Sequence, residues 1–150
     1  MASKEFFDRS TRCLGQEHSA FAPVDGMYTA SQQVAHVAMT VDWFIDGMIR
    51  PEGFDLDFQK HIEQLRRIQS LTQARAMLDA AFDRAIREVQ ARSIEELSRP
   101  LPPGPVMGGA PRFCVIAANS DHTAHHRGSL AVYSRLLGLT PAIPYMEVPS

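Results

Sequence analysis

The stretch PRFCVIAANSDHTAHHRGSLAVYSRLLG, residues 111–138, decides the fold of this chain. Its apolar residues recur at intervals of three and four, which is the period of an α-helix with one buried face. Pro111 suits the first turn of a helix, and Gly138 suits a C-terminal cap. The pattern therefore predicts a long helix from about Pro111 to Leu137. One face of this helix collects Val115, Ala118, His122, His126, Ser129, Tyr133 and Leu136 or Leu137.

The segments before this helix have the same helical periodicity. We expect helices at 3–18, 30–50 and 70–92, a short helix within 55–68, and a further turn after Ser93. Thr29 with Gln32, and Ser70 with Gln73, form capping boxes, in which each side chain can bond a free backbone N–H of the first helical turn. The second helix should bury one stripe of its apolar residues, namely Val34, Val37, Val41, Phe44, Ile45 and Met48.

The segment RPLPPGPVMGGAPR, residues 99–112, separates the last helix from the others. Its five prolines and three glycines exclude regular structure, so we expect a long loop. The predicted fold class is all-α, a four-helix bundle, approximately up-and-down, with a short accessory helix and this Pro/Gly-rich loop, in one domain over residues 1–150. With that order, the loops 20–26 and 99–112 would meet at one end and line the mouth of a site.

Composition excludes several classes of function. A net charge of −2 gives no general attraction to nucleic acid or to an anionic membrane. No apolar run is long enough to span a bilayer, and the N-terminal MASKEFFDRS lacks the apolar stretch of a signal peptide. Cys13 and Cys114 have no metal-type spacing, and free thiols suit a reducing compartment. We therefore expect a cytoplasmic protein that acts on a small molecule, as a monomer or a homodimer.

Two histidines of the last helix are spaced for binding one metal ion. His122 and His126 are four residues apart, so their side chains leave the same face about 5–6 Å apart. His36 lies in the otherwise apolar second helix, and it would complete a three-histidine site with an open coordination position. The alternative is that these are hydrogen-bonded core histidines. The other three have simpler interpretations: His18 at a helix end, His61 in solvent, and His125 on the surface.

Two motifs of this chain resemble the DinB family, whose members are regarded as metalloenzymes. The run DHTAHHRGSLAVYSRLLGLTPAIPY, residues 121–145, is similar to the family's C-terminal HxxxHRGQ signature and the stretch that follows it. ASQQVAHVAMTVDWF, residues 30–44, resembles its other element, a histidine in the second helix followed by an aromatic residue. The resemblance implies a four-helix bundle in which His36, His122 and His126 bind a divalent ion, commonly Ni²⁺ or Zn²⁺. Ser129 departs from the pattern, because the family commonly has glutamine there.

The resemblance also suggests a reaction, because some DinB relatives are described as S-transferases or isomerases. These use a low-molecular-weight thiol such as bacillithiol, mycothiol or glutathione. A hydrolase with metal-bound hydroxide is the alternative enzyme, and it would need a general base, which the ligand face of the last helix does not supply. A non-catalytic, stress-associated metal-binding or interaction protein is the third interpretation. Tyr133, Asn119 and Ser129 are candidates for orienting a bound group beside the histidines.

Overall fold

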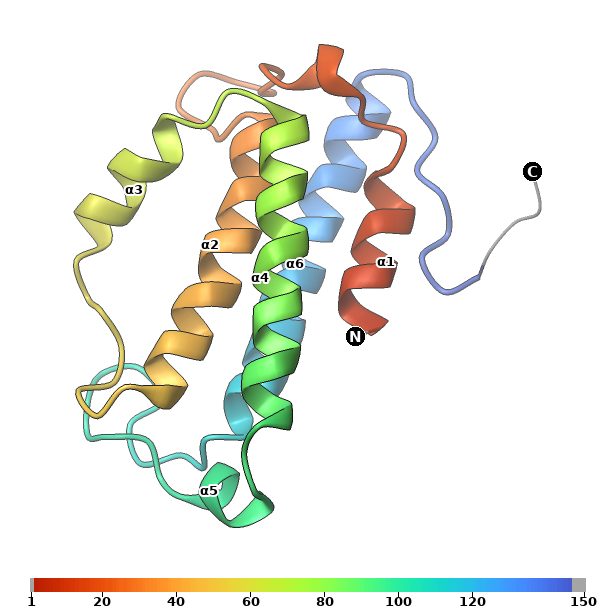
Figure 1. The fold of residues 1–150 in the computed structure, drawn as a ribbon. Coiled ribbons are helices and arrows are strands. Elements are labelled where there is room, and N and C mark those ends of the chain that lie inside the picture. Colours follow the sequence, from red (N-terminus) through yellow and green to blue (C-terminus); the bar gives the residue numbers. More distant parts are fainter. Residues whose placement is uncertain (1, 147–150) are drawn as a thin grey trace.

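The computed structural model describes residues 2–146, and all regular elements in that range are helical (Figure 1). The elements are α1 Ala2–Thr11, the 3₁₀ turn η1 Gln16–His18, α2 Ala30–Ile49, α3 Phe58–Arg66, α4 Leu71–Gln90, α5 Ile94–Ser98 and α6 Cys114–Leu136. The predicted all-α class is therefore confirmed. The first helix is shorter than expected: the N–H of Leu14 bonds the carbonyl of Thr11, and a turn leads into η1.

Local capping determines where the helices begin. Thr29 accepts a hydrogen bond from the backbone N–H of Gln32, whose side chain accepts one from the N–H of Thr29. The Ser70 hydroxyl accepts from the N–H of Gln73 at the start of α4, and the same geometry at Ser93 begins α5. These capping residues satisfy N–H groups that the first helical turn leaves without a partner. The predicted starts of α2 and α4 are confirmed within a residue.

The order of the long helices differs from the up-and-down arrangement expected from the sequence. Figure 1 shows α2 and α4 running in one direction, and α1 and α6 in the other. Ser19 joins the two parallel starts, because its carbonyl accepts from the N–H of Ser31 and its hydroxyl accepts from that of Leu71. Further along both helices, Arg84 of α4 bonds Asp42 of α2 at 2.8 Å. The expectation failed because α3 returns the chain along the bundle before α4 begins.

The core lies around α2, the most buried helix of the structure. The six apolar residues predicted for its inner stripe are all buried. The inner face of α6 is rotated from the predicted one: Leu136 is 60% exposed, whereas Leu130 is fully buried. The rotation brings polar residues inside, since Asn119 and Thr123 are almost inaccessible. Because these two residues are polar, the apolar periodicity of the sequence did not identify the face of α6 that is buried. The Thr123 hydroxyl bonds the carbonyl of Asn119 at 2.8 Å.

The Pro/Gly-rich loop folds back on itself at the end of the molecule where α2 finishes and α6 begins (Figure 1). The N–H of Leu101 bonds the carbonyl of Ala110, and Pro102 packs beside Gly53 in the segment after α2. The loop 20–26 lies at the opposite end, before α2. The two loops therefore do not meet, and the expectation that both line one mouth is wrong. It followed from the incorrect helix order.

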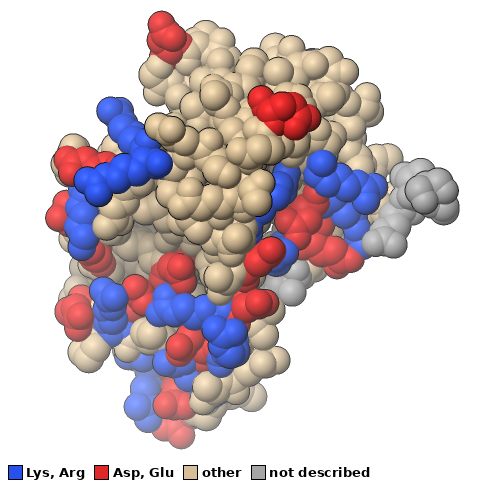
Figure 2. All heavy atoms as spheres, turned by 45° about the horizontal axis from the view of Figure 1, so that its top comes forward, with Lys and Arg blue, Asp and Glu red and all other residues tan. Residues whose placement is uncertain are grey.

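Positive and negative side chains are mixed over the charged part of the surface. In Figure 2, Lys and Arg lie next to Asp and Glu over the charged part of the visible face. This mixture agrees with the small net charge of −2. Within residues 2–146, none of the helices combines the length and apolarity needed to cross a bilayer.

Candidate metal centre

Three histidines from two helices converge as the sequence predicts. His36 comes from α2, and His122 and His126 come from successive turns of α6. One ring nitrogen from each lies within 4.8 Å of the other two. The ring centroids are 4.5 Å apart for the α6 pair, and 5.0 and 4.7 Å from His36 to His122 and His126. Because α2 and α6 are antiparallel, His36 in the first half of α2 lies opposite the middle of α6, where His122 and His126 are found.

The rings of His36 and His122 face each other through their Nε2 atoms, which lie 3.3 Å apart. The other ring nitrogen of His122, Nδ1, is buried and has no hydrogen-bond partner in the described part of the chain. A buried polar atom without a partner costs about 1–3 kcal/mol. The two Nε2 atoms are close enough either to share one proton or to bind one ion placed between them.

A chain of hydrogen bonds determines which nitrogen of His126 carries the proton. The Tyr133 hydroxyl donates to the backbone carbonyl of Tyr28 at 2.9 Å, so its oxygen accepts from Nε2 of Gln33 at 3.3 Å. The amide oxygen of Gln33 then faces Nδ1 of His126 at 2.6 Å. A carbonyl oxygen can only accept, so Nδ1 of His126 is the protonated nitrogen. The lone pair is left on Nε2, free to bind a metal.

The electrostatics keep these rings neutral at pH 7. Burial, followed by repulsion from His36, lowers the pKa of His122 to about 4. Burial, followed by repulsion from His122, lowers the pKa of His126 to about 3. Burial also lowers the pKa of His36, with a smaller contribution from His125. A metal ion binds the neutral imidazole, so no proton has to be removed at neutral pH.

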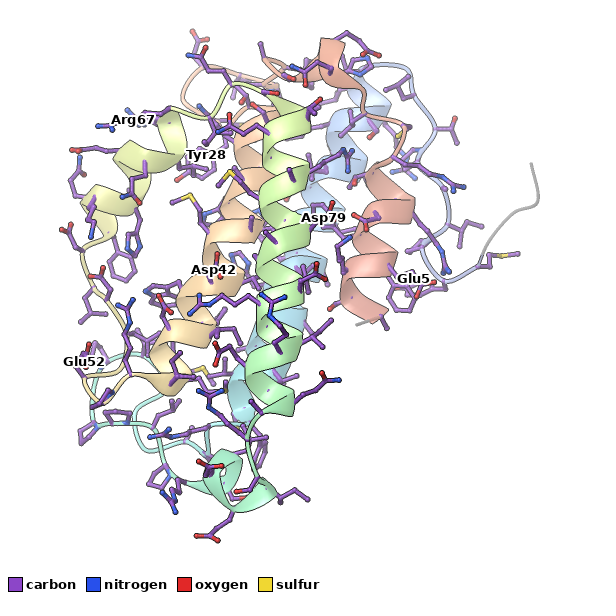
Figure 3. All side chains as sticks on the ribbon, viewed as in Figure 1. Glu5, Tyr28, Asp42, Glu52, Arg67 and Asp79 are labelled. Atoms are coloured by element: carbon purple, nitrogen blue, oxygen red, sulfur yellow. The ribbon has the colours of Figure 1, made fainter. Side chains whose placement is uncertain are left out.

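A cleft of about 340 Å³ leads to two of the three histidines. It lies between α2, α3 and the middle of α6, and its wall is mainly aromatic and aliphatic. Its lining residues are Tyr28, His36, Met39, Thr40, Trp43, Phe44, Phe58, His61, Ile62, Leu65 and His122. In Figure 3, Tyr28 lies between the upper ends of α2 and α3. The cleft can bring a small, largely apolar molecule beside His36 and His122.

His61 has a different environment from the solvated one expected from its sequence context. It is half-buried, it lines the cleft, and its Nε2 lies 3.3 Å from Oδ2 of Asp55. The polar residues around it in the sequence suggested an exposed position. The stripe Phe58, Ile62 and Leu65 is the signal that could have placed α3 against the cleft, since His61 adjoins it on the helix.

The three residues suggested as orienting groups lie in different places. Tyr133 contributes through Gln33, which the sequence analysis did not single out although it precedes His36 by one helical turn. Asn119 lines a separate apolar cavity of about 250 Å³ between α2, α4 and α6. The Ser129 hydroxyl donates to the carbonyl of His125 within α6. Gln33 therefore supplies the amide that bonds a ring of the cluster.

The remaining histidines and cysteines lie outside the cluster. Nδ1 of His18 accepts a hydrogen bond from the N–H of Gly15 at 3.0 Å, and His125 is exposed. Cys13 and Cys114 are both free thiols, as predicted.

Comparison with known proteins gives a consistent result. The sequence profile of the DinB superfamily matches residues 7–130, a range that contains all three clustered histidines. The crystal structure of a DinB-like protein from Bacillus subtilis, YjoA, is similar in fold, with a TM-score of 0.61 at 13% sequence identity. The alignment covers 99% of this chain and 96% of the other. Among curated proteins, none matches the sequence. On the evidence of the family profile, this chain belongs to the DinB superfamily.

Proposed function

We propose that His36, His122 and His126 bind one divalent metal ion, Zn²⁺ or Ni²⁺, in a small-molecule enzyme of the cytoplasm. The observation that carries this proposal is the convergence of three ring nitrogens within 4.8 Å. The donor set fits the ion: the lowered pKa values of His122 and His126 leave both rings neutral, and imidazole is a common ligand of both metals. Gln33 holds one of the rings in the required tautomer.

The site fits catalysis better than a purely structural role. A structural zinc site usually has four protein ligands, whereas the described residues contribute three histidines and no fourth His, Cys, Asp or Glu to this group. His36 and His122 also line the cleft, so an open coordination position would be accessible to a substrate. A bound divalent ion would supply positive charge that acidifies a thiol or a water molecule beside it.

Our first choice of reaction is the transfer of a low-molecular-weight thiol to an electrophile. The cleft residues Trp43, Phe44 and Phe58 offer an apolar wall for the carbon part of such an electrophile. A metal-dependent hydrolase is the second candidate, and one observation favours it. His61 with Asp55 supplies a base on the cleft wall, although the ligand face of α6 has none. Dependence on a thiol separates the two reactions.

The metal is tested by elemental analysis of protein purified without added metal. We expect about one divalent ion per chain, and a sharp loss in each of the variants His36→Ala, His122→Ala and His126→Ala. His18→Ala and His61→Ala serve as controls and should keep the ion, because neither residue belongs to the cluster. Unchanged metal content in His36→Ala would show that the third ligand is wrongly assigned.

The reaction is tested with a panel of bacillithiol, mycothiol and glutathione against small electrophiles. The metal-loaded protein should prefer one thiol, and a chelator should abolish its reaction. Activity that survives metal removal contradicts the proposal. Turnover that needs no thiol and produces only hydrolysis moves the assignment to the second candidate.

A further inference from the structure

His61 lines the cleft and contacts a carboxylate. Its side chain lines the cleft together with His36 and His122, from the side of α3. Behind it, a shallow depression on the surface is lined by His61 and Asp55, and Asp55 does not line the cleft. Nε2 of His61 lies 3.3 Å from Oδ2 of Asp55. The imidazole thus contacts a carboxylate and also borders the cleft, as in enzymes where a carboxylate orients a histidine base.

Asp55 is held in place by contacts on several of its atoms. Its Oδ1 accepts a hydrogen bond from the N–H of Asp57 at 3.0 Å, and its backbone carbonyl accepts from the indole of Trp43 at 2.6 Å. The bond from Asp57 lowers the pKa of Asp55, and the contact with His61 lowers it further. An ionised carboxylate accepts the proton on Nε2 of His61, which leaves the lone pair of a neutral ring on Nδ1.

The other charged groups near this depression have different contacts. Asp46 pairs with Arg50 and Arg84, and Asp42 also pairs with Arg84. Lys60 lies 3.9 Å from Oδ2 of Asp55, at the edge of ion-pair distance. Asp55 is therefore the carboxylate in contact with His61.

We propose that His61, oriented by Asp55, is the acid–base residue of the cleft. This inference rests on the proposed thiol transfer, and it names His61 as the group that takes the thiol proton and delivers it to the product. With an epoxide, the S–H bond of the thiol breaks and Nδ1 of His61 takes the proton. The sulfur electron pair forms a bond to one epoxide carbon, whose C–O bond breaks with its electrons going to oxygen. The oxygen then takes the proton from His61, so thiol and epoxide give a hydroxy thioether with no other reactant.

The first experiment compares two electrophiles on the metal-loaded protein with the preferred thiol of the panel. Styrene oxide leaves an alkoxide that needs a proton, whereas benzyl chloride releases chloride, which needs none. We expect His61→Gln to lower kcat about tenfold with benzyl chloride, where only the removal of the thiol proton is lost, and about 100-fold with styrene oxide, where protonation of the oxygen is lost as well. Glu63→Gln, an exposed change on the same helix, is the matched control and should affect neither.

The outcomes of this comparison distinguish a failure of the role of His61 from a failure of the proposed thiol transfer. Equal loss with both electrophiles, or no loss with either, overturns the role of His61. Loss of metal from His61→Gln also overturns it, because His61 would then belong to the metal site. A wild-type protein inactive toward both electrophiles with every thiol contradicts thiol transfer itself, and the next experiment then decides the role of His61 by binding alone.

The second experiment measures ligand binding to the metal-free protein through the fluorescence of Trp43, the single tryptophan, which lines the cleft. The ligands are 1-phenylethanol, which has the hydroxyl of a ring-opened product, and ethylbenzene, which lacks it. His61→Phe should weaken the binding of 1-phenylethanol about three- to tenfold, the worth of one hydrogen bond, and leave ethylbenzene unchanged. Equal effects on the two ligands, or none, would place His61 away from the reacting oxygen and overturn the inference.

Asp55 is tested as a positioning residue. Asp55→Asn should lower kcat with styrene oxide while KM stays unchanged, and Asp55→Glu should restore part of it. Nitrogen-15 spectra of the His61 ring should show a single neutral tautomer in the wild type and a mixture in Asp55→Asn, a change that a purely structural role would not produce. A single tautomer in both proteins contradicts the role of Asp55.

Discussion

At the scale of single residues, Gln33 has the most specific environment in the candidate metal centre. Its side chain is buried and spans from the Tyr133 hydroxyl to Nδ1 of His126. The Tyr28 carbonyl, which can only accept, determines the direction of every bond in this chain. The protonation state of a candidate metal ligand is thus set by a backbone atom three hydrogen bonds away.

Replacing Gln33 by leucine tests this arrangement, because leucine has a similar size but no hydrogen-bonding group. We expect metal affinity to fall about 10–100-fold, since His126 would lose the partner that fixes its tautomer. Competition with a chelator measures the change. Gln59→Leu, on the exposed side of α3, is the control and should keep wild-type affinity. Equal affinity in wild type and Gln33→Leu would falsify the role of Gln33.

The lowered pKa values of His122 and His126 predict how the stability of the metal-free protein depends on pH. Unfolded rings take up protons below about pH 6.5, whereas the folded rings stay neutral down to about 4 and 3. The unfolded state therefore binds more protons in this window, and the free energy of unfolding decreases as pH falls through it. The slope per ring is less than about 1.4 kcal/mol per pH unit, because solvent screens these partly accessible rings.

Urea denaturation of the metal-free protein between pH 7.5 and 4 measures this dependence. The double variant His122→Phe/His126→Phe should show a flatter profile, because phenylalanine takes up no proton. A wild-type profile as flat as that of the variant would contradict the neutral state of the two rings.

The sequence was sufficient to predict which three histidines converge, but not their surroundings. The spacing of His122 and His126 places both on one side of α6. The position of His36 in an otherwise apolar helix, together with the family motif, added the third histidine. The position of His61 on the cleft wall was missed, because the polar residues around it outweighed the apolar stripe that packs α3 over the cleft. Gln33 could not be assigned because its two partners lie on α6, about 100 residues away. Contacts between distant segments leave no periodic trace in either segment.

At the scale of the elements, the close approach of Phe54 to α2 depends on the absence of a side chain at Gly47. A Cβ atom on Gly47 would lie 2.2 Å from the Phe54 ring, and that ring packs on Trp43 with centroids 4.6 Å apart. Gly128 on α6 offers the opposite case, because a Cβ there would meet nothing within 4 Å. Close packing thus requires glycine at position 47, whereas no contact requires it at position 128.

We expect Gly47→Ala to destabilise the protein, because the overlap with Phe54 outweighs the gain of about 1 kcal/mol that alanine brings to a helix interior. The displaced ring should also change the fluorescence of Trp43. Gly128→Ala is the matched variant and should stabilise by up to about 1 kcal/mol. Thermal unfolding and emission spectra measure both effects. Stabilisation of similar size in the two variants would show that Phe54 does not need the space over Gly47.

The helix boundaries were predictable where a cap defines them, as at Thr29, Ser70 and Ser93. The inner face of α6 was not, because its buried positions include Asn119 and Thr123. Apolar periodicity assumes that buried means apolar, and this helix departs from that assumption near the histidines. Polar residues near a cleft are where sequence periodicity is expected to fail.

At the scale of the whole molecule, the cluster links α2 to α6. A ligand that binds only the folded state stabilises it, by about 4 kcal/mol when its free concentration is 1,000 times the dissociation constant. We therefore expect Zn²⁺ or Ni²⁺ to raise the melting temperature of the wild type and to have no effect on His36→Ala. Calorimetry with and without the ion measures the shift. An equal shift in both proteins would place the ion elsewhere.

The parallel course of α2 and α4 has a consequence for how this architecture can diversify. A helix of 20 residues is about 30 Å long, so the chain after α2 must travel back that distance before α4 can begin. The return segment, residues 50–70, includes α3 and carries Phe58, His61, Ile62 and Leu65 of the cleft wall, whereas His36 and His122 belong to the long helices. Mutations in the return segment can therefore reshape the cleft while the three clustered histidines keep their positions. Changes confined to one contiguous stretch of the gene can therefore alter which small molecule the cleft accepts.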